Sequence, residues 1–435
     1  MLAVARRRIR RAAIAWVSVA VVGGAACRAH PAEPEPASLD AASLAYVRLV
    51  LALGDRDSDS LDGYHGPAAW QEEVRAAHRT LAEIRADAIA RARALTSAPA
   101  ADAETNERRA FLIRQLGAVA SRVDILQGAR PRFDDEARLL FGLEPHDAST
   151  PADAAEGGAA HAGAARAALD RLLPGRGDLT VRYAAFDRQF LIPSDRLPGV
   201  LSRAIEGCRA VTRQRVALPD GERVQVDYVR DLPWSAFTHY EGRFVSRIRV
   251  NVALPLTVDR ALDLACHEAY PGHHTIATLL DARFGASRSE FLVQPLFSPQ
   301  SALHEAAATL APALVFTDEA RVAFERDMLF PLAGLDPSGA ARHVAVGREV
   351  DRLHGVEADV ARRYLDGALD FPRAAAALER DALMPSADAT LKFVNQFRSY
   401  AATYTIGRDR LAAVVRGNWP AYVQTVTAPR QSLSK

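Results

Sequence analysis

An octapeptide in the second half of the chain carries the residue types of a hydrolytic metal site. Residues 267–274 read HEAYPGHH, which begins like the pattern HExxH. In that pattern two His on one helix face bind zinc, and the Glu between them acts as a general base. Here Pro271 stands where the second His is expected, and the next His residues follow at 273 and 274. The chemistry of the site therefore depends on which residue replaces the displaced ligand.

The Pro-Gly pair inside the octapeptide decides the second ligand. In an unbroken helix His274 would lie about 10 Å along the axis from His267, which is far for two ligands of one ion. Pro271 cannot donate a hydrogen bond to the carbonyl of His267, so the helix cannot stay regular. A widened turn would bring His273 to the usual place of the second ligand. We predict His267 and His273 as ligands and Glu268 as the base, with His274 as the alternative ligand or a supporting residue.

A third ligand is expected from a second helix. Ser298-Pro299 is a good helix start, with Ser as the N-cap and Pro at the first helical position. Glu305 would project from that helix about two turns later. It would complete a His₂Glu set for one Zn²⁺ ion with an open fourth position, which is the arrangement of catalytic zinc. Glu290 and Glu241 are the alternatives for this ligand.

The segments around these residues have mainly helical patterns. Thr257 is a suitable N-cap for a helix that leads into the octapeptide. Apolar residues at helical spacing predict a helix over about 106–127. A further helix is expected near 195–213, with Ser194 or Asp195 at its start.

Residues 214–252 differ from the rest because apolar residues alternate there between two turn signals. This pattern predicts a small antiparallel sheet of three or four strands. An exposed edge on the strand 243–252 would hold an extended peptide by main-chain hydrogen bonds. Residues 146–165 are rich in Ala, Gly, Asp and Pro and are expected to form a loop. The fold class is therefore mainly α with a small antiparallel β-sheet. One large domain is expected over 41–435, with a helical lobe over 41–213, the sheet over 214–252 and metal-site helices over 257–435.

The N-terminus has the pattern of an export signal. Five Arg within residues 6–11 precede a short apolar stretch, and small residues lead to Cys27. Residues 1–27 are therefore predicted to be a signal peptide whose Cys27 becomes the lipidated N-terminus of a bacterial lipoprotein. Secretion without a lipid, or an uncleaved anchor, are the alternatives. Residues 28–40 would form a flexible tether to the bacterial envelope, facing the periplasm or the cell surface.

Composition limits the classes of partner and the source of stability. Removal of residues 1–26 takes away five of the 54 basic residues and leaves 49 against 53 acidic ones, a net charge of −4. No basic stripe remains, so nucleic acid is not an expected partner. Apart from Cys27, only Cys208 and Cys266 are present. One possible pair is not a disulfide framework, so the packed core is expected to provide the stability.

The octapeptide resembles the signature of the bacterial "domain of unknown function 885" family. The resemblance extends diffusely over about 45–425 and is specific at 267–274. It implies a zincin-like fold of the gluzincin type, with His267 and His273 as zinc ligands, Glu268 as the base and Glu305 as the third ligand. Weaker matches are Arg348, Asp351 and His354, and the run 403–407, which is similar to a Ser-Tyr-x-x-Gly pattern.

These residues predict an exported zinc peptidase. Glu268 would take a proton from the attacking water and pass it to the leaving amine. The oxyanion needs a hydrogen-bond donor, for which Tyr404 is the first candidate and His354 the second. Two alternatives are a zincin-fold binding lipoprotein without catalysis and a zinc amidase that acts on cell-wall peptides.

Overall fold

The computed structural model describes residues 38–99, 101–144, 153–230, 235–429 and 433. Cys27 and the predicted signal peptide lie outside these residues, as does most of the predicted tether. The first helix, α1, begins at Leu39 after the N-cap Ser38, whose side chain accepts a hydrogen bond from the Ala41 amide. Among the described residues, no helix is both long enough and apolar enough to cross a membrane.

The first half of the chain is helical, as expected. The predicted helix over 106–127 is confirmed as α4, and the helix near 195–213 begins at Leu197 rather than at Ser194 or Asp195. The expected loop over 146–165 is wrong in part, because α6 begins at Asp153. The helices are α1 (Leu39–Arg56), α2 (Ala68–Ala77), α3 (Leu81–Ser97), α4 (Ala103–Leu126), α5 (Phe133–Phe141), α6 (Asp153–Leu172), α7 (Leu179–Asp187) and α8 (Leu197–Arg213).

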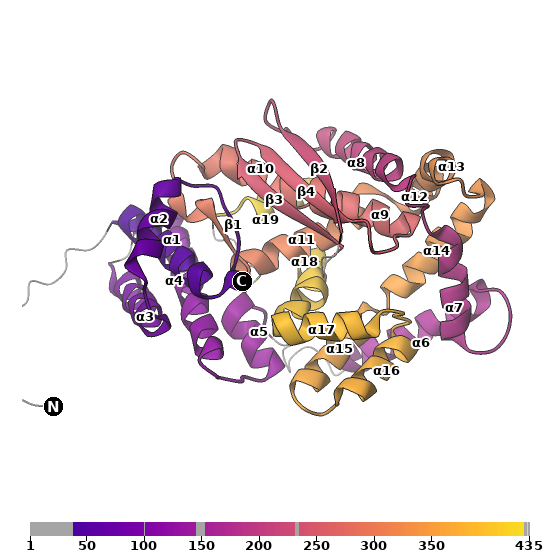
Figure 1. The fold of residues 1–435 in the computed structure, drawn as a ribbon, viewed down its shortest axis with the longest axis horizontal. Helices are drawn as coiled ribbons and strands as arrows, with labels where there is room; N and C mark the ends of the chain where they lie inside the picture. Colours follow the sequence, from indigo (N-terminus) through magenta and orange to yellow (C-terminus); the bar gives the residue numbers. More distant parts are fainter. Residues whose placement is uncertain (1–37, 100, 145–152, 231–234, 430–432, 434–435) are drawn as a thin grey trace, which may run out of the picture. The chain divides into compact units, whose positions relative to one another are not determined.

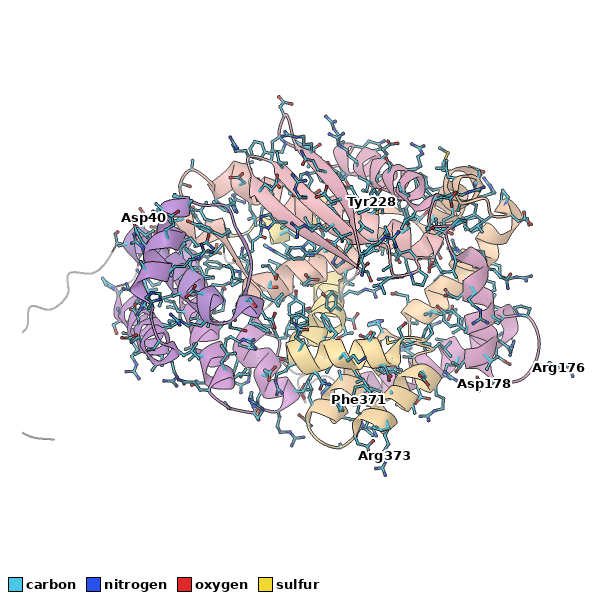
Figure 2. The ribbon with its side chains drawn as sticks, in the orientation of Figure 1. Asp40, Arg176, Asp178, Tyr228, Phe371 and Arg373 are labelled. Carbon is cyan, nitrogen blue, oxygen red and sulfur yellow. A yellow bond between two sulfur atoms is a disulfide. The ribbon has the colours of Figure 1, made fainter. Side chains whose placement is uncertain are left out.

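The three-stranded sheet is mixed, which corrects the antiparallel prediction. It consists of β2 (Arg223–Val229), β3 (Ala236–Gly242) and β4 (Val245–Asn251) in the order β2-β4-β3. β3 and β4 pair antiparallel, but β2 and β4 run parallel. Alternating apolar residues predict which face of a strand is buried, but they do not predict which strands lie beside it. In the order β2-β4-β3, β4 is the central strand, so the prediction of an exposed edge over 243–252 is wrong. The edge strands are β2 and β3. Tyr228 of β2 is 40% exposed (Figure 2).

A second sheet of two short strands was not predicted. β1 (Leu61–Tyr64) pairs antiparallel with β5 (Val293–Pro295), and the register shifts between Leu61 and Gly63. Strands of three or four residues are too short to give a recognisable alternation. This pairing brings the N-terminal part of the chain next to the start of α11 (Pro299–Val315), which follows β5 closely.

Among the remaining helices, α9, α10, α18 and α19 pack against α11. Buried alanines along α11 allow neighbouring elements to approach closely, among them Ala302, Ala306, Ala307, Ala308 and Ala311. Figure 1 shows the sheet with α8, α9 and α10 at the top of the view, α15–α17 at the bottom, and α11 with α18 between them. The helices are α9 (Val258–Leu264), α10 (His273–Phe284), α12 (Asp318–Phe324), α13 (Phe330–Ala333), α14 (Ala340–Asp351), α15 (His354–Leu365), α16 (Phe371–Asp381), α17 (Ala387–Phe397), α18 (Arg408–Val415) and α19 (Trp419–Val426).

Short segments of other helical types complete the chain. Three of them are π-helical turns: η3 (Ala265–Ala269), η5 (Glu325–Leu329) and η8 (Thr403–Gly407). Such turns are frequent at functional sites. Two of the three, η3 and η8, contain residues predicted from the sequence to act in the site, and both pack against α11.

Candidate metal centre

The octapeptide folds as two helical segments with a break between them. α9 continues into the π-helical turn η3, which contains His267 and Glu268 and ends at Ala269. The Gly272 amide then donates a hydrogen bond to the Cys266 carbonyl over 3.0 Å, and α10 begins at His273. The widened turn expected at Pro271 lies earlier, within the helix, and the Pro-Gly pair itself forms the break.

Gly272 is required by its surroundings. The Tyr270–Pro271 peptide bond is cis, and a Cβ at position 272 would lie 1.7 Å from the carbonyl oxygen of His267. No side chain fits at that distance, so the chain can reverse here only with glycine. The Tyr422 hydroxyl donates a hydrogen bond to the Pro271 carbonyl over 3.0 Å and so fixes the break from α19.

The break brings together the three residues predicted as ligands. The Nε2 atoms of His267 and His273 are 3.2 Å apart. Glu305 of α11 places Oε2 at 3.5 Å from Nε2 of His267 and Oε1 at 3.2 Å from Nε2 of His273. Among the described residues, these three form the group of His, Cys, Asp or Glu side chains whose ligand atoms are close enough to hold a metal ion.

The spacing of the three side chains fits a tetrahedral ion. Ligands about 2.0–2.1 Å from zinc in tetrahedral geometry are separated from one another by about 3.3 Å. The two His Nε2 atoms are 3.2 Å apart, and each His faces a different oxygen of Glu305, at 3.5 Å for His267 and 3.2 Å for His273. With one ligand atom taken from each residue, the three atoms all lie within 4.8 Å of one another. Glu305 Oε2 is also a buried oxygen without a hydrogen-bond partner, which an ion would satisfy. The triad is therefore a candidate metal site on its own geometry.

Electrostatics couple the ligands to one another. Burial alone would lower the pKa of His273, but the Glu305 carboxylate outweighs it and raises the pKa to about 9. Burial would likewise raise the pKa of Glu305, but His273 and His267 hold it well below its usual value. A metal ion that binds here must displace a proton from His273, because a metal ligand must be deprotonated.

Glu268 lies beside the ligands and is held by the sheet. Its carboxylate oxygen Oε2 accepts a hydrogen bond from the Thr238 hydroxyl of β3 over 2.7 Å. The same hydroxyl lies 3.1 Å from the Glu268 carbonyl. Thr238 thus fixes the carboxylate without pairing it with a positive charge. Sequence reasoning missed Thr238, because a Thr in a strand carries no signal for this role.

Tyr404 is at the site, whereas His354 is engaged elsewhere. The Tyr404 ring stacks against His267, with centroids 6.4 Å apart. Burial, followed by the negative charges of Glu305 and Glu268, raises the pKa of Tyr404 well above its ordinary value, so its hydroxyl keeps its proton. His354 faces the Asp409 carboxylate over 3.0 Å.

The other sequence candidates for the third ligand are also engaged away from this triad. Glu290 is held by Arg108 at 2.7 Å, and Glu241 by Arg247 at 2.8 Å. Ala306, which follows Glu305, packs against Gly407 of η8, where an added Cβ would lie 3.4 Å from the Ala306 Cβ. Gly407 is the small residue of this contact, and it allows α11 and η8 to approach closely.

His274 supports the break from its other side. Its Nδ1 lies 2.8 Å from Ser246 Oγ and its Nε2 lies 3.0 Å from Glu222 Oε2, so both ring nitrogens are occupied. The Tyr270 hydroxyl donates to the same Glu222 oxygen over 2.5 Å, and Arg209 donates to the other oxygen over 2.6 Å. Of the two roles left open by the sequence, these contacts give His274 the supporting one. Glu222, which sequence reasoning missed, holds Tyr270, directly before the Pro-Gly pair, and His274, two residues after it.

Glu222 should make the stability depend on pH. Burial would raise its pKa, but hydrogen bonds from His274, Tyr270 and Arg209 outweigh it and lower the pKa from 4.5 to about 2. The ionised carboxylate therefore contributes stability that is complete above pH 4.5 and is lost as the pH falls through about 2. Glu222→Gln should be less stable at pH 7 by about 1–3 kcal/mol, and this difference should shrink below pH 4.5. Urea unfolding at several pH values measures it, with the exposed Glu206→Gln as the control; a pH-independent difference would contradict the assignment.

A disulfide fixes the start of the motif. Cys208 of α8 and Cys266 of η3 form a disulfide with Cα atoms 5.5 Å apart. Both side chains are fully buried. Cys266 directly precedes His267, so this bond attaches the first ligand covalently to α8. The sequence analysis named these two cysteines as one possible pair but expected the packed core to provide the stability. The disulfide is a second contribution to that stability.

Asp62 is a further carboxylate, partly exposed, whose charge acts on those of the ligands and which sequence reasoning missed. Burial, and then the charge of Glu305, raise the pKa of Asp62 to about 7, and His273 acts on it in the opposite direction. Asp62 comes from β1, more than 200 residues away along the chain from the triad. An isolated Asp in a short strand gives no sequence signal, so only the folded chain places it here.

The fold is similar to that of proteins with solved structures. A candidate lipoprotein from Colwellia psychrerythraea aligns with a TM-score of 0.50 and 15% identity, over 80% of this chain and 67% of that chain. The M32 carboxypeptidase from Deinococcus radiodurans R1 has a TM-score of 0.45 and 16% identity, over 90% and 87% of the two chains. Trypanosoma cruzi metallocarboxypeptidase 1 has a TM-score of 0.39 and 15% identity, over 90% and 89%. At these identities the likeness concerns the fold alone. No protein-family model matches the chain, and no curated protein sequence matches it.

Proposed function

We propose that the chain is a zinc-dependent peptidase of the zincin class that belongs to the domain of unknown function 885 family. The observation that carries the proposal is the triad of His267, His273 and Glu305, in which one ligand atom from each residue lies within 4.8 Å of the others. Glu268, adjacent in sequence to the first ligand, is the fourth essential residue. A His₂Glu set with one open position is the arrangement of catalytic rather than structural zinc.

The side chains supply the remaining steps of peptide hydrolysis. Bound zinc would polarise the scissile carbonyl and lower the pKa of a water molecule. Glu268, oriented by Thr238, takes the proton of the attacking water and delivers it to the leaving amine. The protonated Tyr404 hydroxyl donates a hydrogen bond to the oxygen that develops negative charge. The edge strand β3, which carries Thr238, offers main-chain groups to an extended peptide.

Export and lipid attachment form part of the proposal. The pattern ending at Cys27 lies outside the described residues, so its support comes from the sequence. The Cys208–Cys266 disulfide supports an oxidising compartment such as the periplasm, because disulfides are rare in the cytosol. The similarity to a candidate lipoprotein fits attachment of this chain to the envelope through a lipid on Cys27.

The proposal predicts that Glu268→Gln will bind metal and lose hydrolysis. Glutamine keeps the size and the hydrogen bond from Thr238 but cannot accept the proton, so kcat should fall by about 10²–10⁴-fold. Zinc content and thermal unfolding should match those of the wild-type protein. The measurement is cleavage of a linear peptide library beside metal analysis of both proteins.

Other outcomes distinguish the alternatives. Hydrolysis that survives Glu268→Gln contradicts the role of Glu268 as base. One bound zinc in the wild-type protein without cleavage of any peptide favours the binding lipoprotein. Cleavage of muropeptides in preference to linear peptides favours the cell-wall amidase.

A further inference from the structure

The turn that carries Tyr404 is packed on two sides. The other four residues of η8 are buried. On the side of α11, Gly407 packs against Ala306. The Tyr404 ring also packs edge-on against Tyr400, with centroids 5.6 Å apart. Because a side chain on a short turn moves with its backbone, the place of the Tyr404 hydroxyl depends on what holds η8 at its C-terminal end.

Two charged residues hold that end. Arg408 and Asp409 follow η8 directly, and both contact residues 351–354, where α14 ends and α15 begins. Arg408 donates hydrogen bonds to both carboxylate oxygens of Asp351, over 2.7 and 2.6 Å. This bidentate geometry is the strongest and best oriented form of an Arg–carboxylate pair. Asp409 places its two oxygens 3.0 and 3.1 Å from Nε2 of His354.

A further contact closes these residues into a ring. Nδ1 of His354 lies 2.7 Å from the carbonyl oxygen of Asp351. Since Arg408 and Asp409 are adjacent in the chain, each joins η8 to the same short segment between α14 and α15. We call this ring the η8 clamp; it consists of Asp351, His354, Arg408 and Asp409. The clamp fixes the end of η8 opposite to its contact with α11.

The η8 clamp requires a protonated His354. Its Nδ1 faces a backbone carbonyl and its Nε2 faces a carboxylate, and both of these groups can only accept a hydrogen bond. A neutral imidazole has a single N–H, so both bonds form only in the imidazolium form. The hydrogen bond to Asp409 raises the pKa of His354 above its ordinary value of 6.5, although burial opposes this. Loss of the proton must break one of the two bonds and open the ring.

The charges of the η8 clamp are balanced in the closed form. Arg408 and the protonated His354 stand against the carboxylates of Asp351 and Asp409. The further acid on which the charge of His354 acts is Glu357 of α15, whose pKa is raised by burial. When His354 becomes neutral, the clamp keeps one positive charge against two negative ones. Hydrogen bonding and charge therefore favour the same protonated state.

We propose that Arg408 and His354 are positioning residues for Tyr404, and that the η8 clamp stays closed only while His354 carries its proton. This inference rests on the proposed peptidase function, in which Tyr404 donates to the oxyanion. The clamp acts through the backbone of η8, so neither positioning residue needs to touch the substrate. A displacement of about 1 Å in a catalytic group can cost about 100-fold in rate, so the hold on this one turn is sufficient to affect hydrolysis.

A double-mutant cycle tests the positioning role. His354→Gln should lower kcat by about 10-fold or more and leave KM unchanged, because the Tyr404 hydroxyl acts in the transition state. Tyr404→Phe should lower kcat by about 10²–10³-fold. Addition of His354→Gln to Tyr404→Phe should lower kcat no further, since the clamp acts through the hydroxyl that is already lost. Equal losses in the two backgrounds would overturn the inference.

The matched control comes from the same helix as Asp351. Arg348 of α14 binds Asp318 at 2.6 Å, outside the η8 clamp, so Arg348→Gln should leave kcat unchanged. The Asp351 and Asp409 side chains are 51% and 53% exposed, and ion pairs of exposed groups stabilise a protein little. Thermal unfolding and zinc content of His354→Gln should therefore match those of the wild-type protein. A loss of zinc or of folding that accounts for the loss of activity would contradict the positioning role.

Asp409→Asn tests the dependence on the proton. The asparagine amide can donate to the bare Nε2 of a neutral His354, while Nδ1–H still donates to the Asp351 carbonyl, so the ring closes without the proton. In the wild-type protein kcat should fall as the pH rises through the raised pKa of His354. Asp409→Asn should keep its kcat over that range, and His354→Gln should have a low kcat without this fall. The same alkaline fall in all three proteins would overturn the inference.

The place of the ring can also be measured without turnover. A 4-fluorophenylalanine incorporated at position 404 does not ionise, so its ¹⁹F resonance reports the surroundings of the ring alone. With His354 present, the resonance should shift over the pH range in which kcat falls, and His354→Gln should abolish this shift. A resonance that ignores pH in the presence of His354 would overturn the inference. A pH-dependent resonance in a protein that cleaves no peptide would contradict the proposed function and leave the η8 clamp standing.

Discussion

His273→Ala should abolish metal binding and peptide hydrolysis together, while the neighbouring His274→Gln should keep the ion. His273 Nε2 lies 3.2 Å from both His267 Nε2 and Glu305 Oε1, so its removal leaves two protein ligands. Loss of a residue that only supports a ligand weakens metal affinity by about 10–100-fold, so loss of the ligand itself should exceed this. Metal affinity is measured by competition with a chromophoric chelator, and hydrolysis with a peptide that the wild-type protein cleaves.

His274→Gln is a demanding control because it differs from the test by one position. His274 is fully buried and bonded to Ser246 and Glu222, so the variant should lose stability while it binds one ion. Glu305→Gln, which retains the shape of the third ligand, guards against a folding defect in His273→Ala. Zinc lost in His274→Gln and retained in His273→Ala would reverse the assignment of the second ligand.

Removal of the Cys208–Cys266 disulfide should lower the free energy of unfolding by roughly 4 kcal/mol. The two cysteines are 58 residues apart, and a cross-link over such a loop restricts the unfolded chain by about this amount in the loop-entropy account. Alanine is a suitable replacement at both positions because both side chains are fully buried. The double variant Cys208→Ala/Cys266→Ala is compared with the wild-type protein by urea unfolding, each with and without reductant.

The disulfide should also affect the metal centre. Cys266 precedes His267, so the reduced protein and the double variant should bind zinc more weakly than the oxidised protein does. Reductant should change the wild-type protein and leave the double variant unchanged, which separates the bond from other effects of the reductant. A double variant as stable as the oxidised protein would show that packing against α8 holds η3 without the covalent link.

The sequence predicted which residues come together at the candidate site better than it predicted the residues that support them. His267 and Glu268 follow from the motif, and Glu305 follows from a capped helix start at Ser298-Pro299, which the structure has as α11. These predictions rest on local rules, because helix caps and the disruption by Pro271 are effects of neighbouring residues. For the same reason the long helix α4 was predicted almost to its ends, whereas the parallel pairing of β2 with β4 was not.

By itself, the sequence determined that two or three His and a Glu meet at an interrupted helix, and it favoured His273 as the second ligand with His274 as the alternative. Only the tertiary structure places the two side chains on opposite sides of the break. The reversal at Gly272 turns His273 towards Glu305, and the buried Glu222, brought in by β2, engages both nitrogens of His274 together with Ser246. Thr238 likewise reaches Glu268 from a separate strand. Contacts between residues so far apart along the chain depend on tertiary packing, and local sequence patterns do not predict them.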